Sequence, residues 1–351
     1  MGKLIIRVDS NTKIGTGHLV RCLALGQAWK DDGGQVIFIV ACQNEVLLQQ
    51  IHEEKFDIHL LRKCYPDDSE SDSTMSVLAA HPNAWVVLDG YHFDEAYQRR
   101  VGKAGHRLLI IDDMAQLKHY YADILLNQNL GAEQLNYPCE PYTCLLLGTQ
   151  YSLLRRDFLA WKSWKRKIPK VARRVLVTFG GSDPENYTIQ AIQALQKIDI
   201  LSLEAIVVVG ASNTHIDELK AAAKQSRVPI RLAHNVKDMA KLMAWADVAV
   251  ALAGSTVWEL IFMSVPALIL AVVDNQIPIA RSTMAADVAI WINHRSQDYI
   301  EILAEELQRL VVDFKRRSDL SLHQRSLIDG LGKERVVQAA GKYIHKVDLE
   351  P

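Results

Sequence analysis

Residues 4–18 read LIIRVDSNTKIGTGH, in which an apolar run is followed by polar residues, two glycines and a histidine. An apolar run that ends near glycines and then opens a helical pattern is typical of the strand–loop–helix unit of α/β nucleotide- or sugar-binding domains. His18 stands where the predicted helix begins. Because an imidazole moves a proton readily near neutral pH, His18 is a candidate catalytic residue. The alternative is a surface histidine near a helix N-cap.

Length and charge narrow the class of protein. The chain has 351 residues, enough for two domains. Its 40 basic and 41 acidic residues give a net charge of −1, which argues against nucleic acid as a partner. No apolar run is long enough to span a bilayer, and no leader pattern precedes the first strand. We therefore expect a cytoplasmic protein without stable membrane insertion; its oligomeric state is left open, a monomer included.

The cysteines favour a reduced compartment. Five are present, an odd number, and no two are spaced as C-x-x-C. This usage predicts neither a disulfide framework nor a structural zinc site. Cys22 falls in the first helical pattern and is expected to be a small buried core residue.

Short apolar runs alternate with helical patterns along the whole chain, which predicts an α/β fold with parallel sheets covered on both faces. Helical patterns include residues 18–31 and 44–55, both interpreted as amphipathic, and the tails 301–314 and 333–345. Strands are predicted at residues 4–9, 35–40, 57–61, 85–89, 108–112, 124–127 and 144–148, and again at 174–179, 203–209, 230–233, 248–252, 267–271 and 290–293.

A basic segment interrupts this alternation. Residues 161–170 read WKSWKRKIPK and are interpreted as a solvated linker. The predicted organisation is a first domain at residues 1–160 that carries His18, a linker at 161–172, and a second domain at 173–351. The sequence leaves open whether the last helix packs back on the first domain. Two Rossmann-like domains that face each other place a cleft between their strand ends.

Two glycine turns in the second half predict an anion site. The first is VTFGGSDP at residues 177–184, where Ser182 or Asp183 could cap the next helix and Pro184 suits its first turn. The second is AGSTVWE at residues 253–259, where Ser255 is a natural N-cap. Backbone amides after Gly181 and Gly254 can hold a phosphate, although such sequences are also good turn formers.

Further polar residues follow these turns. Glu259 lies one turn after Ser255 and Thr256, so it can accept hydrogen bonds from a ribose; the alternative is that it complements the helix dipole. Asp274, Asn275 and Gln276 follow the strand predicted at 267–271, where a bound sugar needs polar partners, although a helix cap explains them equally.

Motifs in a consistent order along nearly the whole chain resemble the UDP-sugar hydrolase family of pseudaminic acid biosynthesis, which is similar in fold to the two-domain GT-B glycosyltransferases. Ala253 and Thr16 depart mildly from the family pattern, and related sequences include polysaccharide and spore-coat glycosyltransferases. The motifs are RVD at 7–9, IGTGHLVRCL at 14–23, IDD at 111–113, LNQN at 126–129, LGTQYSLLR at 147–155, VTFGGSDP at 177–184, GSTVWE at 254–259 and DNQ at 274–276.

The resemblance implies a role for each matching residue. The family's catalytic histidine corresponds to His18, and its tyrosine and asparagine correspond to Tyr91 and Asn275. The second domain is implied to bind UDP. The resemblance implies that the following residues bind UDP or the rest of the substrate: Gly17, Gly181, Ser182, Val236, Gly254, Ser255, Thr256, Glu259 and Gln276. Among them, Ser255 and Thr256 are expected at the diphosphate, Glu259 at the ribose and the Val236 backbone at the uracil.

The implied activity is hydrolysis of UDP-2,4-diacetamido-2,4,6-trideoxy-β-L-altropyranose. Water attacks the anomeric carbon with inversion, His18 acts as general base, and the transition state resembles an oxocarbenium ion. Neither a metal nor a cofactor is expected, and the pairs Asp67-Asp68 and Asp112-Asp113 are interpreted as turns or caps. The alternatives are a GT-B glycosyltransferase that uses a UDP-sugar in surface polysaccharide synthesis, and a non-catalytic sugar-nucleotide-binding protein.

Overall fold

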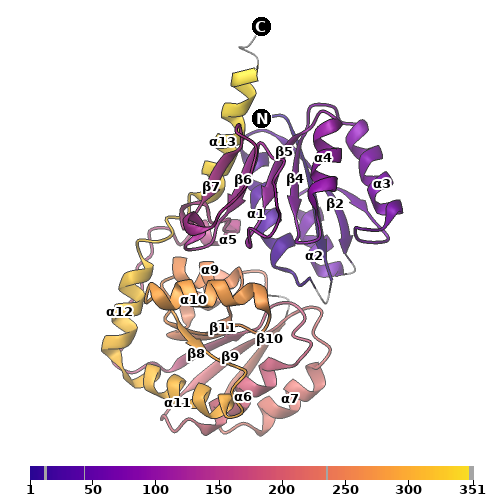
Figure 1. Cartoon of the computed structure of the whole chain (residues 1–351). Coiled ribbons are helices and arrows are strands. Elements are labelled where there is room, and N and C mark those ends of the chain that lie inside the picture. Colours follow the sequence, from indigo (N-terminus) through magenta and orange to yellow (C-terminus); the bar gives the residue numbers. More distant parts are fainter. Residues whose placement is uncertain (12–13, 43, 235, 348–351) are drawn as a thin grey trace. The chain divides into compact units, whose positions relative to one another are not determined.

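The computed structural model describes residues 1–11, 14–42, 44–234 and 236–347 (Figure 1). The chain divides into two compact units. The first comprises Met1–Arg156 together with the chain from Gly330 onward, and the second comprises Asp157–Asp329. Residues 161–172, expected to be a linker, are counted within the second unit.

The first unit is built on a seven-stranded sheet with the order β3-β2-β1-β4-β5-β6-β7, in which every pair is parallel. Each strand predicted in this half is confirmed. The strands are β1 (Lys3–Ser10), β2 (Gln35–Cys42), β3 (Asp57–Leu60), β4 (Trp85–Asp89), β5 (Arg107–Ile111), β6 (Ile124–Asn127) and β7 (Cys144–Leu147).

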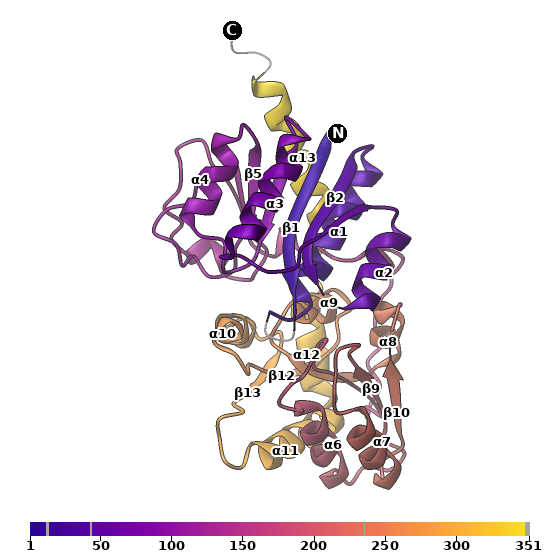
Figure 2. The same ribbon diagram turned by 90° about the vertical axis from the view of Figure 1, so that its right-hand side faces the viewer.

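Helices cover both faces of this sheet (Figure 2). One core contains side chains from α1 (Gly17–Asp31), α2 (Glu45–Glu53) and α13 (Gly332–Val347). The other contains side chains from α3 (Asp68–Ala79) and α4 (Glu95–Lys103).

The first helix differs from its prediction. Helix α1 is buried on nearly every side rather than amphipathic, because α13 packs against it with Val336, Val337 and Ala340 in the same core. Cys22 of α1 is fully buried, as predicted.

The second unit repeats the architecture with a six-stranded parallel sheet in the order β10-β9-β8-β11-β12-β13. All its predicted strands are confirmed, whereas α12 was not predicted. The strands are β8 (Arg174–Thr178), β9 (Glu204–Val209), β10 (Ile230–His234), β11 (Val248–Leu252), β12 (Ala267–Leu270) and β13 (Ile290–Ile292). The helices are α5 (Arg156–Leu159), which starts at the unit boundary, α6 (Tyr187–Lys197), α7 (Ile216–Gln225), α8 (Met239–Trp245), α9 (Thr256–Phe262), α10 (Ile277–Ala285), α11 (Tyr299–Val312) and α12 (Phe314–Gln324).

The solvated-linker interpretation is wrong for Arg166. Its side chain is buried in the second unit and donates hydrogen bonds to the carbonyls of Met243, Ala246 and Met263. These carbonyls lie at the carboxyl ends of α8 and α9, where a helix leaves acceptors unsatisfied and a cation is favoured. Burial lowers the pKa of Arg166 to about 10. A basic residue that reads as solvent-facing therefore holds two helix ends together.

Both sheets reverse their strand order at one place. In the first sheet β1 lies beside β4, and in the second β8 lies beside β11. In open α/β sheets, ligands bind beyond the carboxyl ends of the strands at such a switch point. Both units are thus Rossmann-like, and each has one edge position suited to a ligand. No helix in the described ranges is long and apolar enough to cross a membrane.

Candidate active site

His18 lies at the switch point of the first sheet and is paired with a carboxylate. It is the second residue of α1, after a loop in which Gly15 adopts a φ of +80° that favours glycine. Asp89 is the last residue of β4, the strand beside β1. The Nδ1 atom of His18 lies 2.6 Å from Oδ1 of Asp89. The two residues are 71 positions apart, so strand order creates this pair.

The surroundings of Nδ1 decide where the imidazole proton resides. Arg21 Nη2 is 3.1 Å from the same nitrogen, but Arg21 is a donor only. An unprotonated Nδ1 would set its lone pair against the Asp89 carboxylate, so Nδ1 carries the hydrogen and donates it to Asp89. In the neutral ring Nε2 then holds the lone pair. This is the tautomer that a general base requires.

Arg21 joins this pair to a second carboxylate. Its guanidinium donates to Asp89 through Nε and Nη2, at 2.7 Å each, and to both oxygens of Asp113. Burial by itself raises the pKa of Asp89, but the charges and hydrogen bonds of Arg21 and His18 outweigh it and hold that pKa well below its ordinary value. Asp89 is therefore a carboxylate at neutral pH.

Sequence reasoning missed Asp89, Arg21 and Asp113 as site residues. The sequence predicts a turn or cap for the Asp112-Asp113 pair, and this holds only for Asp112, whose Oδ1 accepts from the amides of Met114 and Ala115. An acidic residue at the end of a buried strand was the available signal for Asp89.

Tyr91 is brought to His18, as its predicted role requires. The edge-to-face contact between the two rings has a centroid separation of 5.0 Å and an interplanar angle of 82°. The Tyr91 hydroxyl donates to Oδ2 of Asp113 at 3.0 Å, and Asn129 donates to the other oxygen of that carboxylate at 2.8 Å. Gly17, the first residue of α1, is adjacent to His18 in the chain. The first unit thus assembles an imidazole, a phenol and two carboxylates around one arginine.

In the second unit, the sheet order gathers the predicted anion-binding loops. Gly181 and Ser182 follow β8, and Gly254 follows β11, the neighbouring strand at the switch point. Gly180 adopts a φ of +80°, and a Cβ there would meet open space. A backbone hydrogen bond stabilises this loop: the Ser212 amide N–H donates to the Gly181 carbonyl oxygen at 3.0 Å.

Two of the predicted caps differ from their expectation. Helix α6 begins at Tyr187 with Asn186 as its N-cap, so Pro184 lies outside its first turn. Buried Asp183 supports the cap by accepting from the backbone amides of Tyr187 and Thr188. Ser255 occupies the N-cap position of α9, but its side chain makes no capping hydrogen bond.

The remaining predicted residues also follow carboxyl ends of strands in this sheet. Thr256 begins α9, and buried Glu259 lies one turn later on the same side of the helix. Val236 follows β10 and is half-buried; the adjacent Asn235 lies outside the described residues. Asn275 and Gln276 belong to a short 3-10 turn after β12, where the side-chain oxygen Oε1 of Gln276 accepts from the backbone amide of Val272 at 2.9 Å. Asn275 belongs to the second unit, whereas His18 and Tyr91 belong to the first.

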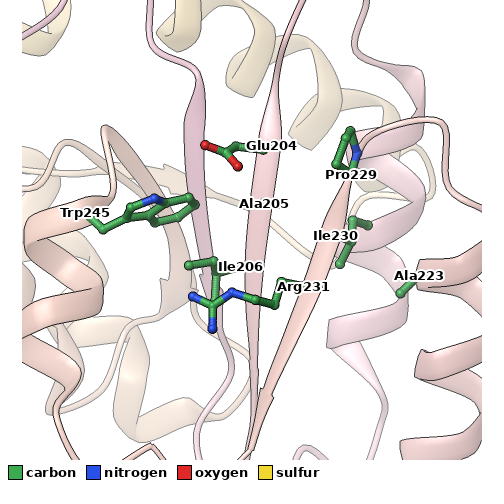
Figure 3. A pocket seen from close by; sticks show the side chains of 8 residues that line it. All are labelled: Glu204, Ala205, Ile206, Ala223, Pro229, Ile230, Arg231 and Trp245. Carbon is green, nitrogen blue, oxygen red and sulfur yellow. The ribbon is translucent and has the colours of Figure 1, made fainter.

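A pocket of about 440 Å³ in the second unit lies at the opposite edge of the sheet (Figure 3). Its lining comes from the amino-terminal ends of β9 and β10, from α7 and from the end of α8, with Glu204, Arg231 and Trp245 as its polar and aromatic members. None of the predicted site residues lines it. It is therefore separate from the edge at which an α/β sheet binds nucleotides.

Comparisons with known proteins point to sugar-nucleotide chemistry. Residues 175–339 match the model of the glycosyltransferase family 28 C-terminal domain. The spore coat polysaccharide biosynthesis protein SpsG of Bacillus subtilis is 24% identical over 94% of this chain and 95% of its own length. The UDP-2,4-diacetamido-2,4,6-trideoxy-β-L-altropyranose hydrolase of Campylobacter jejuni is 25% identical over 78% of this chain and 93% of its own. The uncharacterized protein MJ1062 of Methanocaldococcus jannaschii is 26% identical over 76% of this chain; the match spans only 55% of that protein.

Solved glycosyltransferase structures share the fold. MurG of Acinetobacter baumannii has a TM-score of 0.65 at 15% identity, covering 97% of this chain and 99% of its own. CalG4, the calicheamicin glycosyltransferase, has a TM-score of 0.68 at 14% identity and covers 98% of each chain. The chain thus has the GT-B fold of two Rossmann-like domains, as predicted.

Proposed function

We propose that the chain hydrolyses a UDP-linked diacetamido-trideoxy sugar, namely UDP-2,4-diacetamido-2,4,6-trideoxy-β-L-altropyranose, to UDP and the free sugar. The observation that carries the proposal is the His18–Asp89 pair at the switch point, in which Asp89 fixes the hydrogen on Nδ1 and leaves Nε2 as a base. The C. jejuni relative, whose name states this activity, supports the choice of substrate.

In the proposed reaction, a water oxygen attacks the anomeric carbon while its proton moves to Nε2 of His18. The bond from that carbon to the diphosphate oxygen breaks, and UDP leaves with the bonding electron pair. The transition state has oxocarbenium character, and attack opposite to the leaving group inverts the anomeric configuration. Tyr91 packs against the imidazole and limits its orientation. We also assign Asn275, a polar residue of the second unit, to this step.

The second unit would hold the leaving group. Backbone amides after Gly181 and Gly254 would stabilise the growing negative charge on the diphosphate. We assign Gly17, which precedes His18 in the chain, to the glycosyl part of the substrate. We assign Ser182, Ser255 and Thr256 to the diphosphate, Glu259 to the ribose and the Val236 backbone to the uracil. Gln276 would orient the sugar with the nitrogen that its own loop contact leaves available. No step of this reaction uses a metal or a cofactor.

A glycosyltransferase is the second candidate. The family 28 match and the SpsG relative favour it, because both names refer to glycosyl transfer or polysaccharide synthesis. The same base would then deprotonate an acceptor hydroxyl instead of water. A non-catalytic sugar-nucleotide-binding protein is the third candidate. Binding alone does not require an oriented base, so the His18–Asp89 pair does not favour it.

Time-resolved proton NMR distinguishes the three. Purified protein is mixed with the UDP-diacetamido-trideoxy-altrose without any acceptor, and the His18→Ala variant serves as control. We expect UDP and free sugar to appear with the α anomer first, and we expect the variant to lose about a hundred- to ten-thousand-fold in rate. Intact substrate that nevertheless binds saturably would favour a transferase or a binding protein. Retained turnover in the variant would remove His18 as the base.

A further inference from the structure

A second imidazole–carboxylate pair lies at the same switch point. Nε2 of His92 is 2.9 Å from Oδ2 of Asp9. Asp9 is near the carboxyl end of β1, and His92 follows β4 by three residues. The two pairs are crossed: β4 supplies the carboxylate for His18, and β1 supplies the carboxylate for His92.

The chemistry around the second pair parallels that around the first. Arg7 bridges Asp9 and Glu70, as Arg21 bridges two carboxylates beside His18. Val8 is paired with Asp89 across the sheet, and successive strand residues alternate between faces. Asp9 therefore points to the opposite face of the sheet from Asp89. At the switch point, the carboxyl edge of the sheet thus has the His18 network on one face and the His92 network on the other.

His92 is the partly solvent-exposed member of its network. The side chains of Arg7, Asp9 and Glu70 are completely buried, whereas that of His92 is 22% exposed. Asp9 is a carboxylate, since hydrogen bonds from His92 and Arg7 outweigh its burial and lower its pKa to about 2. Nε2 of His92 consequently carries a hydrogen that it donates to Asp9. In the neutral ring Nδ1 is left as an acceptor, and in the described part of the chain no residue donates to it.

The Cε1–Nδ1 edge of the His92 ring lies close to Gly90. A Cβ on Gly90 would lie 2.6 Å from Cε1 and 3.0 Å from Nδ1 of His92. Only a residue without a side chain lets this edge of the ring sit against the backbone between Asp89 and Tyr91. Phe93 packs against the ring with a centroid separation of 4.2 Å. Nδ1 is therefore held beside Gly90, which lies in the chain between the two residues that contact His18.

We infer that His92 is a specificity-determining residue, whose Nδ1 accepts a hydrogen bond from an N–H or O–H group of the glycosyl part of the sugar nucleotide. The inference rests on the proposed function, because it places the sugar at this switch point. Acetamido groups supply N–H donors of this kind. The buried network beneath the ring serves to hold it, since an imidazole tied at Nε2 and packed against Phe93 loses little freedom when Nδ1 binds a ligand.

Two substitutions separate this role from a structural one. The amide nitrogen of glutamine can replace Nε2 of histidine, so His92→Gln keeps a donor for Asp9 but removes Nδ1. The matched control is His119→Gln, because His119 also places Nε2 on a carboxylate, that of Glu140 at 3.0 Å, elsewhere in the first unit. Both are made in the His18→Ala background, which prevents turnover. Calorimetry then measures the affinity for UDP and for the UDP-diacetamido-trideoxy-altrose.

We expect His92→Gln to leave the affinity for UDP and the melting temperature unchanged and to weaken binding of the UDP-sugar by roughly three- to tenfold, the worth of one neutral hydrogen bond. The His119→Gln control should change neither affinity. Unchanged UDP-sugar binding in His92→Gln, or an equal loss for UDP and UDP-sugar, would overturn the inference alone. A His18→Ala parent that binds neither ligand would overturn the proposed function and this inference with it.

Discussion

Asp89 fixes the tautomer of His18, which the proposed reaction uses as its base. Replacing it by asparagine keeps the shape but removes the charge that fixes the hydrogen on Nδ1 and stabilises the imidazolium formed after proton transfer. We expect Asp89→Asn to reduce kcat by about a hundred- to ten-thousand-fold, with UDP affinity unchanged. Steady-state rates and calorimetry measure the two effects. Asp72→Asn, at an exposed ion pair with Arg100, is the control, and a normal kcat in Asp89→Asn would contradict the dyad.

Asp9 makes the stability of the first unit sensitive to acid. Its pKa is lowered from 3.8 to about 2 in the folded protein, so it contributes fully above pH 4 and loses its contribution as the pH falls towards 2. The loss amounts to about 2 kcal/mol of unfolding free energy. Urea unfolding at several pH values measures it. Asp9→Asn, although less stable at neutral pH, should show a flatter dependence between pH 4 and 2; an unchanged slope would exclude Asp9 as the cause.

At the scale of single residues, the sequence proposes His18 and the family resemblance adds Tyr91, but neither shows which residues hold them. A histidine after glycines is visible locally. Its contact with Asp89 spans 71 residues and that of Arg21 with Asp113 spans 92, so both depend on strand order. The pairing of His92 could not be predicted for the same reason, because its partner Asp9 lies 83 residues away on the strand beside β4.

Among the elements, every strand was predictable because buried parallel strands are nearly continuous apolar runs. The failures concern residues whose environment is set by distant elements. Helix α1 looked amphipathic because nothing local shows that α13 covers its outer side. Arg166 looked solvated because its acceptors lie 77 to 97 residues away, at two helix ends.

The loop after β8 gives a test at the scale of the element. A Cβ on Gly210, which follows β9, would lie 2.2 Å from the Gly181 carbonyl oxygen and 2.5 Å from that of Gly180. Gly210→Ala must therefore displace the predicted diphosphate loop without touching the ligand. We expect UDP affinity to fall about tenfold or more, corresponding to at least about 1.4 kcal/mol.

The control for this loop is Gly102→Ala in α4, where a Cβ meets no atom within 4 Å. Alanine there should leave UDP affinity unchanged and stabilise the helix by about 0.5–1 kcal/mol. Circular dichroism and urea unfolding establish that both variants are folded before calorimetry. A folded Gly210→Ala protein with normal UDP affinity would show that the loop after β8 does not bind the diphosphate.

For the whole molecule, the proposed function divides the reaction between two units of similar architecture. Each unit has one switch point, and the two carry different chemistry: His18 with its carboxylate in the first, glycine turns in the second. A nucleotide alone should therefore affect only the second unit, whereas an intact sugar nucleotide should affect both. The proposed reaction depends on this difference, because the base and the leaving-group site belong to separate folding units.

Hydrogen exchange of the full chain in the His18→Ala background tests this division. UDP should slow exchange at residues 180–183 and 253–259, since a ligand suppresses local opening where it binds. The UDP-sugar should add protection at residues 17–20 and 89–92. Protection by UDP at residues 204–206 and 230–231 instead would place the nucleotide in the 440 Å³ pocket at the amino-terminal edge. Identical protection by UDP and the UDP-sugar would contradict the placement of the sugar at His18, because the sugar would then bind without any effect on the first unit.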